Sequence, residues 1–291
     1  MVGTAPIRGF KTARGLAVIV RPGNVVLTAL SVLTGAFCAS APVDSRLLLA
    51  CLAASLIGAG GYVLNDVFDL TIDRINRPDR PLPSGAVPTP LAVAWAIVLM
   101  LSGLACAIIL CGPFPWIAAT VVAGLSAYAA WLKRTAVVGH LLVAFMSGLC
   151  FVFGGLLGGN VVVSLAPALL AACFHLGREF LKAAADREGD LASGARTLAV
   201  THGVRTSCVV GSIPLIGVVI LSPLPVLLGW FGWVYLLVVI AGVDSVLAYV
   251  AVSCLREPDT KQTARLVGIL KWDMIAGLLA IWSDLCFRLW H

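Results

Sequence analysis

Long apolar stretches alternate with short polar connections along the chain. Nine of these stretches come close to the roughly 20 residues that a helix needs to cross the hydrocarbon core of a bilayer. They run over residues 23–41, 46–66, 90–111, 114–132, 137–157, 161–182, 207–228, 229–252 and 266–289. The pattern predicts an all-α polytopic membrane protein with nine transmembrane helices.

Composition supports the membrane class. The chain is 60% hydrophobic and only 12% charged, with a mean hydropathy of +1.02, whereas a soluble domain has about a quarter of its residues charged. Residues 1–21 are basic and lack an apolar core with a cleavage site. We therefore interpret them as a cytoplasmic lead-in to one domain spanning residues 1–291, and not as a signal peptide.

Basic residues predict the orientation in the membrane. If the N-terminus is cytoplasmic, all of the 20 Lys and Arg residues except Arg46 and Arg288 fall on or near the inner face. This asymmetry satisfies the positive-inside rule and agrees with an odd number of spans. The net charge of +6 then reflects topology and gives no reason to expect nucleic acid as a partner. The longer polar connections also lie on the inner side, so we expect any chemistry at the cytoplasmic face of the cell (inner) membrane.

A first acid segment, 65-NDVFDLTIDRINRPDRPLPSG-85, follows the second stretch. If the helix continues through Asp73, four oxygen-bearing side chains fall within about 100° of arc: Asn65, Asp66, Asp69 and Asp73. Neighbouring carboxylates repel one another, and such a face suits Mg²⁺, which binds through a few carboxylates together with substrate phosphates. The alternative is a solvated helix end with ion pairs to Arg74 and Arg77.

Prolines and arginines dominate the rest of this segment. Prolines 78, 81 and 83 end the helix and predict an extended loop. The guanidinium groups of Arg74, Arg77 and Arg80 could neutralise a diphosphate.

A second acid segment, 178-REFLKAAADREGDLASGARTL-198, follows the sixth stretch. On a helix, Lys182, Asp186 and Asp190 share a face with Glu179. Lys182 is either a point charge for a phosphate or an interfacial lysine whose stem lies along apolar surface. Two acid segments with basic residues between them suit a diphosphate bound through Mg²⁺, which would neutralise a leaving group as a C–O bond breaks.

Several motifs resemble those of the UbiA superfamily of intramembrane prenyltransferases. They are 21-RPGN-24, 65-NDVFDLTID-73, 76-NRPDRPLPSG-85, 128-YAAWLKR-134 and 186-DREGD-190. The resemblance implies nine helices around a central cavity that is capped on the cytoplasmic side. In that cavity Mg²⁺ would hold a polyprenyl diphosphate, whose prenyl group passes to a hydrophobic acceptor.

The resemblance also implies roles for individual residues. The Mg²⁺ ligands would be Asp66, Asp69, Asp73, Asp186 and Asp190, and the central catalytic set Asp66, Asp69, Lys182 and Asp186. The diphosphate contacts would be Arg77, Arg80, Lys133, Arg134 and Lys182. The cavity would be lined by Asn24, Asn65, Tyr128 and His140. The chain departs from the superfamily at Ala183, where a third aspartate is frequent, and at His140, where asparagine is usual. His140 is either a substitute polar group in the cavity or a polar helix start.

The acceptor class is predicted from two stretches. NRPDRPLPSG and REFLKAAADREGD look most similar to geranylgeranylglycerol-phosphate geranylgeranyltransferases, which act in ether-lipid synthesis. An aromatic or chlorin-type acceptor, as in quinone or pigment synthesis, is the alternative. A cation-coupled transporter is a further alternative. It is disfavoured because the first, third, fourth, fifth and seventh stretches contain no Asp or Glu.

Overall fold

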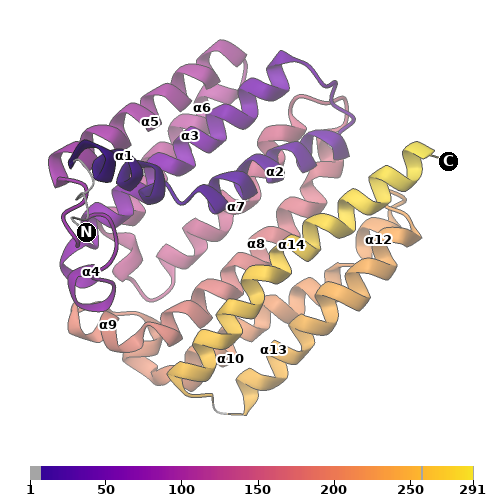
Figure 1. Cartoon of the computed structure of the whole chain (residues 1–291). Helices are drawn as coiled ribbons and strands as arrows, with labels where there is room; N and C mark the ends of the chain where they lie inside the picture. The colour runs from indigo at the N-terminus through magenta and orange to yellow at the C-terminus, as the bar shows by residue number, and fades with distance from the viewer. Residues whose placement is uncertain (1–7, 257, 291) are drawn as a thin grey trace, which may run out of the picture. The chain divides into compact units, whose positions relative to one another are not determined.

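Helices make up the folded chain. The computed structural model describes residues 8–256 and 258–290, and no strand occurs among them. The helices (Figure 1) are α1 (Arg8–Ile19), α2 (Pro22–Cys38), α3 (Ser45–Phe68), α4 (Leu70–Asn76), α5 (Thr89–Leu110), α6 (Phe114–Ala130), η1 (Leu132–Arg134), α7 (Val138–Gly155), α8 (Val161–Ala185), α9 (Arg187–Ala192), α10 (Leu198–Leu221), α11 (Leu224–Leu227), α12 (Trp233–Val238), η2 (Val239–Asp244), α13 (Ser245–Leu255) and α14 (Thr260–Trp290). The predicted all-α class is confirmed.

Seven helical segments of the described chain are long and apolar enough to cross a membrane. They are Ser45–Phe68, Thr89–Leu110, Val138–Gly155, Val161–Ala185, Leu198–Leu227, Trp233–Leu255 and Thr260–Arg288. The pair Thr12–Ile19 and Pro22–Cys38, bent by 41°, passes the same test as one broken span, while Phe114–Ala130 is apolar but shorter. Each predicted stretch therefore contains a helix, and the protein is an integral membrane protein.

Two compact units divide the described residues. Unit 1 is drawn from Met1–Ala29 and Leu48–Trp131, and unit 2 from Leu30–Leu47 and Leu132–His291. Helix α2 begins in unit 1 and ends in unit 2. Each unit carries one of the two acid segments.

Close helix contacts at glycine hold unit 1 together. A Cβ atom at Gly103 of α5 would lie 2.7 Å from the carbonyl oxygen of Ala53 in α3. A Cβ atom at Gly61 of α3 would lie 2.8 Å from Cδ1 of Leu125 in α6. Small residues of this kind let membrane helices approach backbone to backbone. Helix α3, whose end carries the first acid segment, is thereby fixed against α5 and α6.

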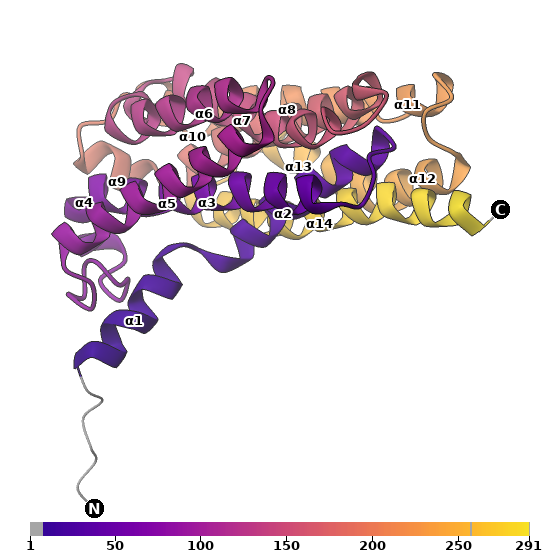
Figure 2. The ribbon, with the colours of Figure 1, turned by 90° about the horizontal axis from the view of Figure 1, so that it is seen from above.

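The bend after α1 positions the start of α2. Ile19 is buried in the core of unit 1 together with Leu82 and Val87 from the loop between α4 and α5. Gly15 packs so closely that an added Cβ would lie 2.6 Å from Cγ2 of Val87. Figures 1 and 2 show α1 running beside this loop. Arg21 follows α1 with a positive φ of 54° and turns the chain into α2.

Unit 2 is built around α8. Helix α8 contacts α7, α10 and α14, and α12 packs against α14, as Figures 1 and 2 show. Gly154 of α7 approaches α2, since an added Cβ would lie 1.9 Å from the carbonyl oxygen of Val32. Because α7 and α8 are consecutive and antiparallel, the first turn of α7 lies near the last turns of α8.

Two irregular backbone positions shift the predicted helix bounds. Helix α10 begins at Leu198, earlier than the predicted 207, because a kink at Gly203 with φ 90° joins an extra first turn to it. The predicted stretch 229–252 is realised as α12, the π-helical η2 and α13. The η2 segment ends at the buried Asp244, whose Oδ2 accepts a hydrogen bond of 2.7 Å from the hydroxyl of Ser222.

Candidate active site

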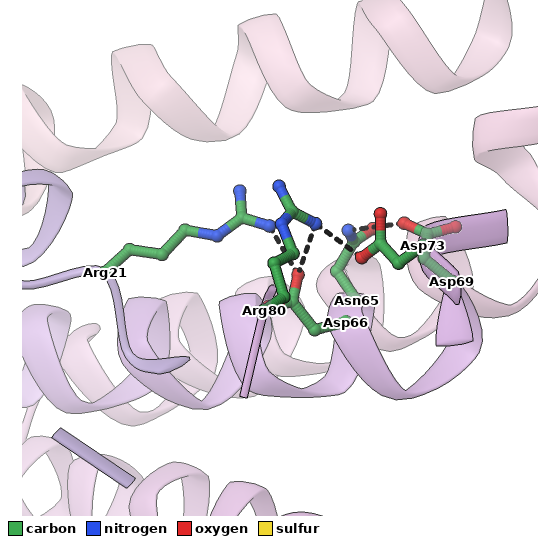
Figure 3. A network of polar contacts seen from close by, with 6 residues as sticks. All are labelled: Arg21, Asn65, Asp66, Asp69, Asp73 and Arg80. Atoms are coloured by element: carbon green, nitrogen blue, oxygen red, sulfur yellow. Dashed lines mark hydrogen bonds and ion pairs between the residues drawn. The ribbon is translucent and has the colours of Figure 1, made fainter. Parts of the chain in front are cut away.

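The first acid segment keeps its helical register across a break. Asp69 stands between α3 and α4 with φ −88° and ψ 0°. Its backbone nitrogen still donates to the carbonyl of Asn65 at 2.9 Å, and the nitrogen of Asp73 donates to the carbonyl of Asp69 at 2.8 Å. The acidic side chains therefore share one face, as the spacing predicts, and Figure 3 shows them gathered there.

Two guanidinium groups neutralise this face. Asp66 and Asp73 are buried, with 4% and 6% of their surface exposed. Nη1 of Arg80 lies 2.5 Å from Oδ2 of Asp73 and 3.4 Å from Oδ1 of Asp66. Nη2 of Arg21 donates to the same Oδ1 of Asp66 (Figure 3). Charge-assisted bonds of this type are among the strongest in proteins, so the two cations hold the buried carboxylates in place.

Asn65 orients the third acid. Its Nδ2 donates to Oδ2 of Asp69 at 2.8 Å, and both side chains are half-buried. This contact places Asn65 beside Asp69, and its role in lining the cavity stays a prediction.

The proline-rich loop returns Arg80 to the acids. The backbone nitrogen of Ser84 bonds to the carbonyl of Arg80 at 2.9 Å, and that of Val87 bonds to the carbonyl of Pro81 at 3.0 Å. These turns fold the loop back on α4, and the burial of Leu82 anchors it. Arg77 is exposed in the same loop.

Arg21 is a contributor that the sequence alone did not reveal. It opens the RPGN motif, but only Asn24 of that motif was expected in the site. Its guanidinium carbon also lies 5.5 Å from the ring centroid of Tyr62 on α3. The sequence signal that could have indicated Arg21 is the presence of both the RPGN motif and the NDxxD motif in one chain. The half-buried Asn24 lies next to it, at the start of α2, and its backbone nitrogen bonds to the Arg21 carbonyl at 2.9 Å.

The second acid segment, in unit 2, repeats the construction of the first. Asp186 stands between α8 and α9 with φ −91° and ψ 9°. Its nitrogen donates to the carbonyl of Lys182 at 2.9 Å, and the nitrogen of Asp190 donates to the carbonyl of Asp186 at 3.0 Å. Each segment thus has an aspartate at a one-residue helix break and another aspartate one turn later. Asp186 is exposed, Asp190 is half-buried, and Ala183 is buried at the start of the same turn.

Unit 2 brings three predicted basic or polar positions close to this segment. The backbone nitrogen of Arg196, shortly after α9, donates to the carbonyl of Arg134 at 2.9 Å. A Cβ at Gly139 would lie 3.1 Å from Cα of Lys133, which places η1 against the first turn of α7 and therefore beside His140. Tyr128 is half-buried on α6, in unit 1.

Comparison with known protein families identifies the family of this chain. A model of the UbiA prenyltransferase family matches residues 27–275. The chain belongs to this family. The match covers both units and both acid segments, and it makes the protein an intramembrane prenyltransferase.

Relatives of this UbiA-family chain include proteins named digeranylgeranylglyceryl phosphate synthase. The digeranylgeranylglyceryl phosphate synthase of Natronomonas pharaonis is 38% identical over 233 residues, covering 78% of this chain and 83% of that protein. The synthase of the same name from Methanopyrus kandleri is 34% identical over 267 residues, covering 92% and 97%.

Solved structures share the UbiA fold. One described under the name digeranylgeranylglyceryl phosphate synthase superposes with a TM-score of 0.78 at 30% identity, covering 94% of this chain and 98% of that one. A UbiA homologue from Archaeoglobus fulgidus, bound to DMAPP and Mg²⁺, superposes with a TM-score of 0.59 at 17% identity, covering 90% and 97%. The second likeness concerns the fold alone.

The acidic residues of this UbiA-family protein fit Mg²⁺ in donor chemistry. Asp66, Asp69 and Asp73 offer carboxylate oxygens, the ligands that Mg²⁺ prefers. Among the described residues, no group of three or more His, Cys, Asp or Glu side chains converges into a metal geometry. Arg21 and Arg80 contact Oδ1 of Asp66, and Arg80 contacts Oδ2 of Asp73. A divalent cation bound to these oxygens would compete with the guanidinium groups.

Proposed function

We propose that the protein catalyses Mg²⁺-dependent transfer of a polyprenyl group from a prenyl diphosphate to geranylgeranylglyceryl phosphate, a step of ether-lipid synthesis. The observation that carries the proposal is the pair of equally built acid segments in a UbiA-family chain. Relatives named digeranylgeranylglyceryl phosphate synthase, which align along most of the chain, support the choice of acceptor.

Carboxylates from the two acid segments are the metal ligands in this proposal. The Mg²⁺ ligands are Asp66, Asp69, Asp73, Asp186 and Asp190. Bound Mg²⁺ neutralises the charge that develops on the departing diphosphate. The diphosphate contacts are Arg77, Arg80, Lys133, Arg134 and Lys182, with Asp66, Asp69, Lys182 and Asp186 as the central catalytic set. The cavity around the reacting carbon is lined by Asn24, Asn65, Tyr128 and His140.

Arg80 has two partners in the catalytic cycle. Without substrate it neutralises Asp66 and Asp73, the contacts that are present in the structure. With the donor bound, Asp66 and Asp73 would hold Mg²⁺, and the guanidinium of Arg80 would contact the diphosphate. This exchange keeps the buried charges paired at each stage, which avoids the cost of an isolated buried carboxylate.

The chemical step exchanges one C–O bond for another. The bond between C1 of the prenyl chain and the diphosphate oxygen breaks, and the diphosphate leaves with the bonding electrons. The free hydroxyl of the acceptor glycerol attacks C1 and loses its proton. An apolar, water-poor cavity limits capture of the allylic carbon by water.

Topology completes the proposal. Nine helices cross the cell (inner) membrane, the N-terminus is cytoplasmic, and the site faces the cytoplasm. The near-absence of Lys and Arg from the predicted outer side supports this arrangement, and the bent pair α1–α2 and the short α6 supply the two spans beyond the seven long ones.

An acceptor screen tests the assignment. The purified protein in detergent, with geranylgeranyl diphosphate and Mg²⁺, is offered geranylgeranylglyceryl phosphate, 4-hydroxybenzoate or a chlorin alcohol acceptor, and products are identified by mass spectrometry. We expect a prenylated product with the glycerol-phosphate acceptor. Transfer only to the aromatic or chlorin acceptor would overturn the assignment, and absence of transfer to all of them would overturn the proposed reaction.

A further inference from the structure

A buried carboxylate in unit 2 is surrounded by basic groups. Glu179 of α8 is 6% exposed. Its Oε2 lies 3.4 Å from Nζ of Lys182, and its Oε1 lies 3.7 Å from Nη1 of Arg178. It also lies within electrostatic range of His140 and His175. Two cationic side chains and two imidazoles are therefore near one carboxylate.

His140 is the member of this cluster that lacks a polar partner. It is 4% exposed, and within the described residues neither Nδ1 nor Nε2 has a hydrogen-bond partner. Its ring packs edge-on against Phe180, with the centroids 4.9 Å apart. Buried polar groups normally have partners because an unmade bond costs about 1–3 kcal/mol. The orphaned nitrogens thus indicate a group that arrives with a ligand.

Arg178 points to the same conclusion. Its Nε is buried and has no hydrogen-bond partner among the described residues, and its nearest carboxylate oxygen is at 3.7 Å, which is too long for a good hydrogen bond. An arginine usually uses its planar fork on a carboxylate or phosphate at shorter range. Part of the fork is therefore available for an anion.

The donors without a partner select the ligand. Arg178 carries a permanent positive charge, and its Nε and the two ring nitrogens of His140 are buried without a hydrogen-bond partner among the described residues. Such groups favour an anion that can take up their hydrogen bonds. A phosphate monoester carries a charge of about −1.5 to −2 and three acceptor oxygens, which suits these donors.

We propose that Arg178 and His140, with Glu179 holding Arg178 and Lys182 in place, form the binding site for the phosphate monoester of the acceptor lipid. The inference rests on the proposed function in that the phosphate is taken to be the acceptor's. It assigns recognition of the acceptor headgroup to the start of α7 and the last turns of α8. It also gives His140 a function at the position where the superfamily usually has asparagine.

Binding of the acceptor without donor and without Mg²⁺ tests the site independently of catalysis. Thermal-shift titrations compare geranylgeranylglyceryl phosphate with geranylgeranylglycerol, which lacks the phosphate. The variants are Arg178→Gln and His140→Phe, the latter keeping a ring against Phe180. We expect wild type to bind the phosphate lipid at least about tenfold more tightly, and each variant to lose about tenfold for that lipid alone, the size expected for a charge-assisted hydrogen bond.

Steady-state kinetics separates the two phosphate sources. In the variants the KM for geranylgeranylglyceryl phosphate should rise at least about tenfold, while the KM for geranylgeranyl diphosphate should stay within about twofold of wild type. A rise in the KM for the donor alone would assign the cluster to the diphosphate and overturn the proposal. Unchanged binding of the acceptor by both variants would also overturn it. Arg265→Gln, an exposed arginine on α14, is the matched control.

The remaining outcomes are also decisive. Arg178→Lys keeps the positive charge but loses the planar fork of the guanidinium. We expect its affinity for geranylgeranylglyceryl phosphate to lie between those of wild type and Arg178→Gln. Phosphate-selective binding that depends on Arg178, without any prenyl transfer, would support the site and overturn the proposed function. Prenyl transfer by both variants with an unchanged KM for the acceptor would support the proposed function and overturn the site.

Discussion

Arg80, in the loop that follows α4, forms an ion pair with Asp73 on that helix, Nη1 to Oδ2 at 2.5 Å. The same guanidinium reaches Asp66 at 3.4 Å. The cation therefore lies between two buried carboxylates, where charge neutralisation is needed whether or not a metal is present.

Replacing Arg80 should make folding depend on metal. Arg80→Gln leaves Asp73 and Asp66 buried with less positive charge, which should lower the free energy of unfolding by about 1–3 kcal/mol. Mg²⁺ should restore more stability to the variant than to wild type, because the ion replaces the missing cation. Thermal unfolding in detergent, with and without Mg²⁺, measures both effects. Arg74→Gln, an exposed position on α4, should change little, and an Arg80→Gln protein as stable as wild type and indifferent to Mg²⁺ would contradict the pairing.

The second acid segment should be as necessary as the first. Asp190→Asn and Asp186→Asn should each lower kcat for prenyl transfer at least about a hundredfold, since an electrostatic group acting on a leaving anion contributes on that order. Glu188→Gln removes an exposed acid of the same short helix and should leave kcat unchanged. Equal effects of all three substitutions would indicate a general surface-charge effect instead of metal binding.

Packing of α2 on α7 should tolerate no side chain at Gly154. Gly154→Ala places a Cβ 1.9 Å from the carbonyl oxygen of Val32, so the helices must separate at a cost of about 1–3 kcal/mol. Gly268→Ala, on α14 with open space around it, should be neutral or stabilising by up to about 1 kcal/mol. Melting temperatures of the two purified variants make the comparison, and equal melting temperatures would count against the close contact.

Topology can be measured with thiol labelling. Cys111 is exposed at the end of α5, on the side that the basic residues predict to be outside. A variant retaining only Cys111 should react with a membrane-impermeant maleimide on intact cells. An Asp79→Cys variant in a cysteine-free chain should react only after permeabilisation. The opposite pattern would invert the proposed orientation.

Local features of the site could be predicted from the sequence. The shared face of Asn65, Asp69 and Asp73 follows from their spacing, and it survives the break at Asp69 because the backbone bonding pattern continues. The same holds for Asp186 and Asp190. Helix positions were also predictable from apolar length, since a bilayer leaves little choice for the backbone.

Long-range contacts could not be predicted in this way. Arg21 is 45 residues away from Asp66, and it reaches the carboxylate through a bend whose positive φ leaves no mark in the residue type. The return of Arg80 depends on the burial of Leu82, which a proline-rich sequence does not reveal. His140 meets Phe180 across the contact of α7 with α8, where Gly148 lets the two helices approach closely.

Mg²⁺-dependent release of diphosphate tests the central claim most directly. Purified wild-type protein, given geranylgeranyl diphosphate and geranylgeranylglyceryl phosphate, should release one diphosphate per prenylated product with Mg²⁺ present, and none with EDTA. Asp66→Asn and Asp69→Asn should abolish the release, while Asp79→Asn, an exposed acid of the neighbouring loop, should retain it. Equal release by wild type, Asp66→Asn and Asp69→Asn, or release that persists in EDTA, would contradict the account.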